Sequence, residues 1–184
     1  MSTAEPLRTL GLLAMRWSGL ALALGVAAAQ MWVEAAVAML VALAQVVGWR
    51  WRLPIRWEAA CSTACLIAAG SSFFLLYERI PWWDIPVHLT LNGLLAVLVA
   101  HVLRPPAPSA KAIVVTGAVL ALVWELMERA GWSWVDASIH VAPADTVLDI
   151  AAGLGGAVAA ALIWHRSRRR DRRSRQPEPT VEGG

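Results

Sequence analysis

The chain has 184 residues, of which 58% are hydrophobic and only 16% are charged, and its formal net charge is +3. A soluble globular domain is roughly 45–50% apolar and about 25% charged. The composition therefore argues against an ordinary soluble domain and favours an all-α, polytopic integral membrane protein.

The apolar residues gather in helix-length segments. A helix that crosses a bilayer needs about 20 mostly apolar residues. In chain order, six segments meet this need, at about 10–29, 32–49, 59–77, 86–103, 111–130 and 147–165. The first two are so close that we expect a tight helical hairpin. Nearby prolines fall between segments or in a first helical turn, where they remove no intrahelical hydrogen bond. We predict one six-helix transmembrane domain over residues 1–165.

The distribution of basic residues predicts the orientation of these spans, because loops rich in Lys and Arg stay in the cytoplasm. Thirteen basic residues fall in the N-terminus, the second and fourth loops and the tail, against Arg79 and Arg129 on the opposite side. Both termini are therefore expected in the cytoplasm. Arg16 lies inside the first span, near enough to its start for the side chain to reach the interface. The alternative for this segment is a signal peptide cleaved near 27–29, which would leave five spans.

The tail at 166–184 is basic and then contains Pro and Glu, so we predict a disordered cytoplasmic segment. We interpret its arginines as an anchor for the last helix, with anionic lipid headgroups as the alternative partner. Membrane lipids are the expected partners, and nothing in the tail requires nucleic-acid binding. Cys61 and Cys65, four residues apart, are too far for a relaxed disulfide and are expected to be small buried apolar residues.

The chain contains 11 Trp residues, and many fall at the edges of the apolar segments. Tryptophan is enriched at both interfaces of a bilayer, so we predict an aromatic belt. Its members would be Trp49, Trp51, Trp57, Trp82, Trp83, Trp132, Trp134 and Trp164.

Six acidic or histidine side chains form three pairs, each on its own apolar segment. The pairs are Asp84 with His88, Glu125 with Glu128, and Asp145 with Asp149. Spacings of three or four residues place both members of a pair on one helical face. In the predicted topology all three pairs lie at one depth in the outer leaflet. Ionisable residues inside a membrane are costly, so the pairs indicate a shared polar site.

Each pair also has a structural explanation. Asp84 and Asp145 could be N-caps, and Asp149 would suit the helix dipole. Glu125 could pair with Arg129, one helical turn away, and His88 could be an ordinary buried histidine.

Several carboxylates in a low dielectric need a cation, or some of them must take up protons. One His with several carboxylates suits a divalent metal such as Zn, Mn or Fe. The candidate ligands are Asp84, His88, Glu125, Asp145 and Asp149. The candidate catalytic groups are Glu125, Glu128 and His88, with Glu128 as a base or as a neighbour of the ligands. The alternative is a proton relay or an acid–base pair without metal.

Three short strings carry a family resemblance. They are Y-E-R-I-P-W-W-D-I-P-V-H from Tyr77 to His88, W-E-L-M-E from Trp124 to Glu128 and D-T-V-L-D from Asp145 to Asp149. Over about 75–160 the chain resembles the YjdF-type bacterial inner-membrane proteins and, more distantly, the VanZ-like membrane proteins. The resemblance implies a small multi-pass protein of the bacterial inner membrane and no particular activity.

Two classes of function remain, with a structural or accessory role as a third. The first is an intramembrane enzyme, metal-assisted, acting on a lipid or lipid-linked substrate at the outer leaflet. The second is a small ion- or proton-coupled transporter. Against the second, no inverted repeat is detectable, and toward the cytoplasmic side Gln45 and His101 are the only uncharged polar candidates. Asn92 extends the His88 face inward, while Gly153 and Gly156 suit close helix packing.

Overall fold

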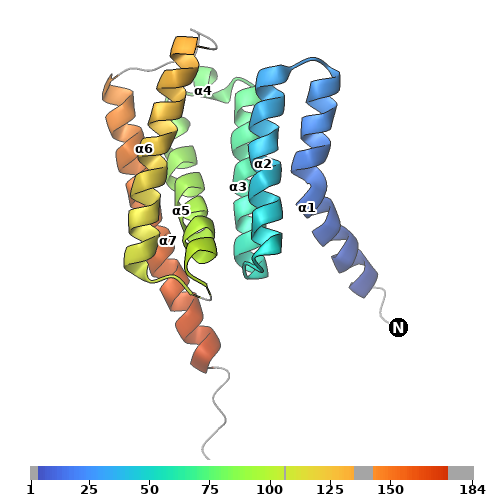
Figure 1. Cartoon of the computed structure of the whole chain (residues 1–184), viewed down its shortest axis with the longest axis vertical. Coiled ribbons are helices and arrows are strands. Elements are labelled where there is room, and N and C mark those ends of the chain that lie inside the picture. The colour runs from blue at the N-terminus through green and yellow to red at the C-terminus, as the bar shows by residue number, and fades with distance from the viewer. Residues whose placement is uncertain (1–3, 106, 135–142, 174–184) are drawn as a thin grey trace, which may run out of the picture.

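The computed structural model describes residues 4–105, 107–134 and 143–173, and this part of the chain forms helices and no strand (Figure 1). The helices are α1 (Ala4–Ala28), α2 (Trp32–Arg50), α3 (Ile55–Phe73), α4 (Leu76–Arg79), α5 (Asp84–Leu103), α6 (Ala110–Trp134) and α7 (Pro143–Arg173). The all-α prediction is confirmed. Five helices, namely α1, α2, α5, α6 and α7, are long and apolar enough to cross a membrane.

The third predicted span is displaced from its helix. α3 begins earlier than the predicted 59–77 and also ends earlier, at Phe73. The early start places Arg56 and Glu58 in its first turns, and α3 is not among the helices that are apolar enough to cross a membrane by composition alone. The early end follows from Leu75, whose left-handed φ of 57° turns the chain before the short α4.

The α1–α2 hairpin is tight, as predicted. Gln30 has a φ of 61°, and its N–H donates to the Ala27 carbonyl, while the Met31 N–H donates to the Val26 carbonyl. The turn that follows α2 is similar, with a φ of 54° at Arg52. In both turns a residue in the left-handed region satisfies carbonyls that the helix end would otherwise leave unpaired.

Figure 1 shows the long helices side by side, with α1 and α2 at one flank, α5, α6 and α7 at the other, and α3 between them. The described ends of the chain, at Ala4 and Arg173, lie at the same end of the bundle, called here the termini end. Large apolar side chains face outward on several helices, including Leu24, Leu126 and Val147 at 65%, 67% and 66% exposed. Such a surface fits lipid rather than water.

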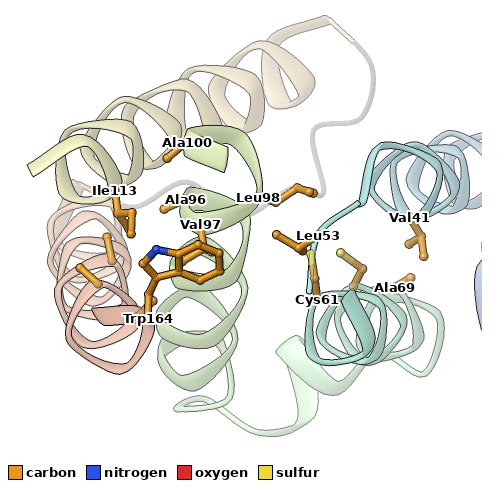
Figure 2. Close-up of a cluster of buried hydrophobic side chains, with 14 residues drawn as sticks. Val41, Leu53, Cys61, Ala69, Ala96, Val97, Leu98, Ala100, Ile113 and Trp164 are labelled. Carbon is orange, nitrogen blue, oxygen red and sulfur yellow. The ribbon is translucent and has the colours of Figure 1, made fainter. Parts of the chain in front are cut away.

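The core lies around α5 and consists largely of small residues, with Trp164 as its largest side chain (Figure 2). α5 and α7 cross closely, because a Cβ on Gly93 would come within 2.5 Å of the Gly156 carbonyl oxygen. A Cβ on Gly156 would in turn collide with the carbonyl of Leu89. Gly156 therefore has the packing role expected from its sequence context.

Trp164 is a correction to the predicted aromatic belt. It is fully buried, at 0% exposed, and its ring packs edge-on against Trp57 with the centroids 5.2 Å apart. Figure 2 shows its indole directed toward α5. Trp164 lies at the end of the predicted span, but α7 continues past it to Arg173, and its ring packs against Trp57 of α3 and His101 of α5. Cys61 and Cys65 are buried in the same core, as expected.

The first span holds an ion pair that the sequence interpretation did not include. Arg16 forms a two-pronged ion pair with Glu58, whose side chain is only 3% exposed. Gln45 lies near this pair and bonds to α1, accepting from the Gly19 N–H and donating to the Ser18 hydroxyl. The negative charge of Glu58 on α3, 42 residues away in sequence, holds the Arg16 side chain against the bundle.

α7 corrects the predicted tail. The helix continues to Arg173, so 166–173 are helical instead of disordered. Ser167 already belongs to this extension, and its hydroxyl donates to the Trp164 carbonyl. The remaining tail at 174–184 lies outside the described residues.

Candidate metal site

The start of α5, the end of α6 and the start of α7 meet at the end of the bundle opposite the termini end (Figure 1). One buried amide joins these helices. Asn92 Nδ2 on α5 donates to the Gly117 carbonyl on α6 at 3.0 Å and to the Gly153 carbonyl on α7 at 2.8 Å. Asn92, expected as a polar contact on the His88 face, thus fixes the spacing of the helices that carry the three pairs.

Three of the predicted ligands converge. Asp84, His88 and Asp149 each offer a ligand atom, and these atoms all lie within 4.8 Å of one another. Asp84 Oδ1 is 3.2 Å from His88 Nε2, a contact made possible by the i,i+4 spacing on α5. Asp149 reaches the pair from α7, because the two helices cross closely.

Asp149 is the least accessible member of this trio. Its side chain is 3% exposed, and Oδ1 has no hydrogen-bond partner among the described residues. An oxygen buried without a partner is destabilising, so buried carboxylates are normally paired or bind a metal. This oxygen is therefore available to a further ligand.

One separation within the trio matches both a direct ion pair and a metal centre. Two donor atoms that each lie about 2.0–2.1 Å from a tetrahedral ion are separated by about 3.4 Å. The 3.2 Å between Asp84 Oδ1 and His88 Nε2 is close to this value. One imidazole and two carboxylates form a donor set that suits Zn, Mn or Fe and leaves further positions for water or substrate.

The glutamates of α6 stand beside this trio. Glu128 accepts a hydrogen bond of 2.7 Å from Trp124 Nε1, and the Trp124 ring lies edge-on to His88 with centroids 6.2 Å apart. Glu125 is buried, at 8% exposed. Asp149 interacts electrostatically with both Asp145 and Glu125, although neither belongs to the group of close ligand atoms.

Two structural explanations of the pairs are not supported. The first residue of α5 is Asp84, preceded by Trp83 at the N-cap position, and the helix has no side-chain cap hydrogen bond. Asp84 therefore contacts His88 instead of capping its helix. Among the described residues, Glu125 forms no ion pair with Arg129, so the expected local neutralisation does not occur.

The sequence interpretation missed two aromatic neighbours of the site. Trp124 holds Glu128, and Tyr77 on α4 donates through its hydroxyl to the Ala68 carbonyl at 3.3 Å. Burial raises the pKa of the Tyr77 phenol, and the negative charges of Asp84 and Glu128 raise it further. Both aromatic residues lie inside the strings that carried the family resemblance. Their place in these strings was the sequence signal that could have identified them as neighbours of the site.

Comparison with known proteins gives one family. The model of the family described as "Predicted membrane protein (DUF2238)" matches residues 7–170, nearly the whole chain, and this is the YjdF-like family that the three strings indicated. Curated proteins and solved structures provide no match to the chain. The more distant resemblance to VanZ-like proteins stays a prediction. The chain therefore belongs to the family of predicted membrane proteins DUF2238.

Proposed function

We propose that the chain is a bacterial inner-membrane protein with six spans and both termini in the cytoplasm. The sixth span would be α3, added to the five helices that are long and apolar enough to cross a membrane. Two observations support this topology. Ala4 and Arg173 lie at the same end of the bundle, which requires an even number of crossings. The loops at that end carry most of the basic residues, as the positive-inside rule demands of a cytoplasmic face.

The charges on α3 are compatible with a span. Glu58 is buried against Arg16, so its charge is neutralised inside the bundle and does not face lipid. Arg56 lies in the first turn of α3, where a long basic side chain can extend to the interface.

We further propose that the opposite end of the bundle, in the outer leaflet, carries a divalent-metal site that serves an enzyme. The observation that carries this proposal is the convergence of Asp84, His88 and Asp149 around the unpartnered Asp149 oxygen. These three residues would hold the ion. A bound divalent cation polarises a carbonyl or phosphoryl oxygen and makes a bound water more acidic.

The chain's own groups supply the remaining roles. Glu128, positioned by Trp124, is the candidate general base, and Glu125 is placed to accept or release a proton beside it. Asp145, which interacts with Asp149 but stands outside the close group, would tune the charge of the site.

The surroundings of the site favour a lipid or lipid-linked substrate. The turns that carry the acidic residues also present large apolar side chains outward, including Leu126 and Met127 on α6 and Val147 and Leu148 on α7, each at least half exposed. A substrate with an acyl or isoprenoid chain could lie on these surfaces while its polar group reaches the site.

The transporter alternative is less well supported. Toward the termini end, Gln45 is bonded to α1, and His101 Nε2 lies 3.1 Å from the Trp51 carbonyl. Among the described residues these side chains serve helix packing and form no continuous polar path with the candidate site.

The test is turnover of membrane lipids. The purified protein, loaded with Zn, Mn or Fe, is reconstituted with a bacterial lipid extract, and lipid species are followed by mass spectrometry. We expect a metal-dependent change in one lipid class, lost in Glu128→Gln and retained in the matched surface variant Glu78→Gln. An unchanged lipid profile with every metal, together with cation uptake into sealed vesicles, would favour the transporter.

A further inference from the structure

A groove of about 410 Å³ runs between α3, α5 and α7, from Leu89 near the candidate metal site toward the termini end. Its lining includes Ala60 on α3, Gly93 on α5, and Gly156 and Ala159 on α7. The groove exists because these residues are small, so α3 and α7 can both pack beside α5 without filling the space between them. Its volume falls within the range of about 300–1,000 Å³ that is usual for small-molecule sites.

The two ends of the groove differ in chemistry. Leu89 and Thr90 line the end toward the metal site, whereas Arg56, Trp57 and Ser167 line the termini end. None of the described residues that line the groove is acidic. The termini end therefore combines a guanidinium, a hydroxyl and an indole with an apolar channel leading away from them.

Further positive charge surrounds that end. Arg168 follows Ser167 on α7, and its guanidinium lies 5.5 Å from the centre of the Trp164 ring. Arg56 lies in the first turn of α3, where the helix dipole adds partial positive charge. Basic pockets between transmembrane helices are known to bind anionic lipid headgroups.

We propose that this groove binds one anionic phospholipid, with an acyl chain along Ala60, Gly93 and Ala159 and the phosphate at Arg56. The apolar lining fits the chain, and the charge at the termini end fits the headgroup. A neutral lipid would occupy the same channel without the ionic contact. The occupant is separate from the substrate proposed above, because its phosphate would lie at Arg56, at the termini end of the groove.

The test uses the full-length, delipidated protein in detergent and native mass spectrometry. Phosphatidylglycerol and phosphatidylcholine with identical acyl chains are titrated separately. We expect phosphatidylglycerol to bind several-fold more tightly. Arg56→Gln should weaken its binding about fivefold, the contribution of one basic residue near a lipid phosphate, and leave phosphatidylcholine unchanged. The matched variant Arg104→Gln, at the same end but outside the groove, should behave as wild type.

A second pair of variants tests the channel itself. Ala159 is exposed and lines the groove, so Ala159→Leu fills the channel without disturbing the core and should weaken both lipids. Ala151→Leu makes the same change at an exposed position of α7 outside the groove and should weaken neither. Equal lipid binding by these two variants, or equal affinity of wild type for both lipids, would overturn the proposal. If the wild type is a dimer in detergent and Ala159→Leu alone is a monomer, the groove is an interface between two copies and the proposal is overturned.

Discussion

Replacement of Glu58 by Gln tests the buried ion pair between α1 and α3. In the wild type, Arg16 Nε and Nη2 donate to the two carboxylate oxygens of Glu58, the second bond measuring 3.0 Å. The Glu58 side chain is 3% exposed and that of Arg16 is 23% exposed, so water replaces little of the lost interaction. Removal of one partner of a buried pair costs about 3–5 kcal/mol, because the other charge remains buried and unpaired.

For a protein of this length, each kcal/mol lowers the melting temperature by about 2–4 °C. Glu58→Gln should therefore melt roughly 6–20 °C below wild type, measured by circular dichroism in detergent. The control Glu78→Gln, on the exposed surface of α4, should change stability by no more than about 0.5 kcal/mol.

The double variant Arg16→Met/Glu58→Leu tests whether the loss of stability comes from the charge that a single substitution leaves unpaired. It removes both charges together, and replacement of a whole buried pair by apolar residues is often nearly neutral. We expect it to recover most of the stability that either single change removes. A double variant that loses as much as the two single variants added together would refute the reasoning, because the two residues would then act independently.

Two further predictions concern the surroundings of the candidate site. Asn92→Leu removes both hydrogen bonds that join α5 to α6 and α7, so it should lower the free energy of unfolding by about 1–3 kcal/mol and weaken metal binding; wild-type stability and affinity would contradict this role. The chain has a single tyrosine, so phenolate absorbance near 295 nm reports Tyr77 alone. Because burial raises the pKa of Tyr77, its titration midpoint should lie above the usual value of about 10. The unfolded chain then releases its proton first, so this contribution to stability is complete below about pH 10 and is lost as the pH rises further. A midpoint at or below about 10 would contradict the burial of this side chain.

The helices were predictable because average hydropathy and helix-terminating residues are local properties. α2 spans Trp32–Arg50 against a predicted 32–49, and α5 spans Asp84–Leu103 against 86–103. α3 was displaced because its boundaries depend on a partner distant in sequence. Glu58 can belong to an apolar bundle only because Arg16, 42 residues away, neutralises it. Hydropathy windows contain no information about such a partner.

The candidate site, like the helices, was predictable where it depends on spacing within one helix and not where it depends on contacts between helices. The pairing of Asp84 with His88 follows from their spacing on one helix, which the sequence displays directly. The approach of Asp149 depends on the close crossing of α5 and α7 at Gly93 and Gly156, which spacing alone does not specify. For the same reason the sequence could not separate Asp149, inside the close group, from Asp145, one turn earlier on α7.

The most direct test of the central claim is the metal content of the detergent-purified protein after loading with Zn, Mn or Fe and removal of free ions. The account predicts about one tightly bound ion per chain, lost in Asp149→Asn. The matched variant Asp145→Asn, on the same helix but outside the close group, should keep its ion. Absence of bound metal from the wild type, or retention of the ion by Asp149→Asn, would contradict a metal centre formed by Asp84, His88 and Asp149.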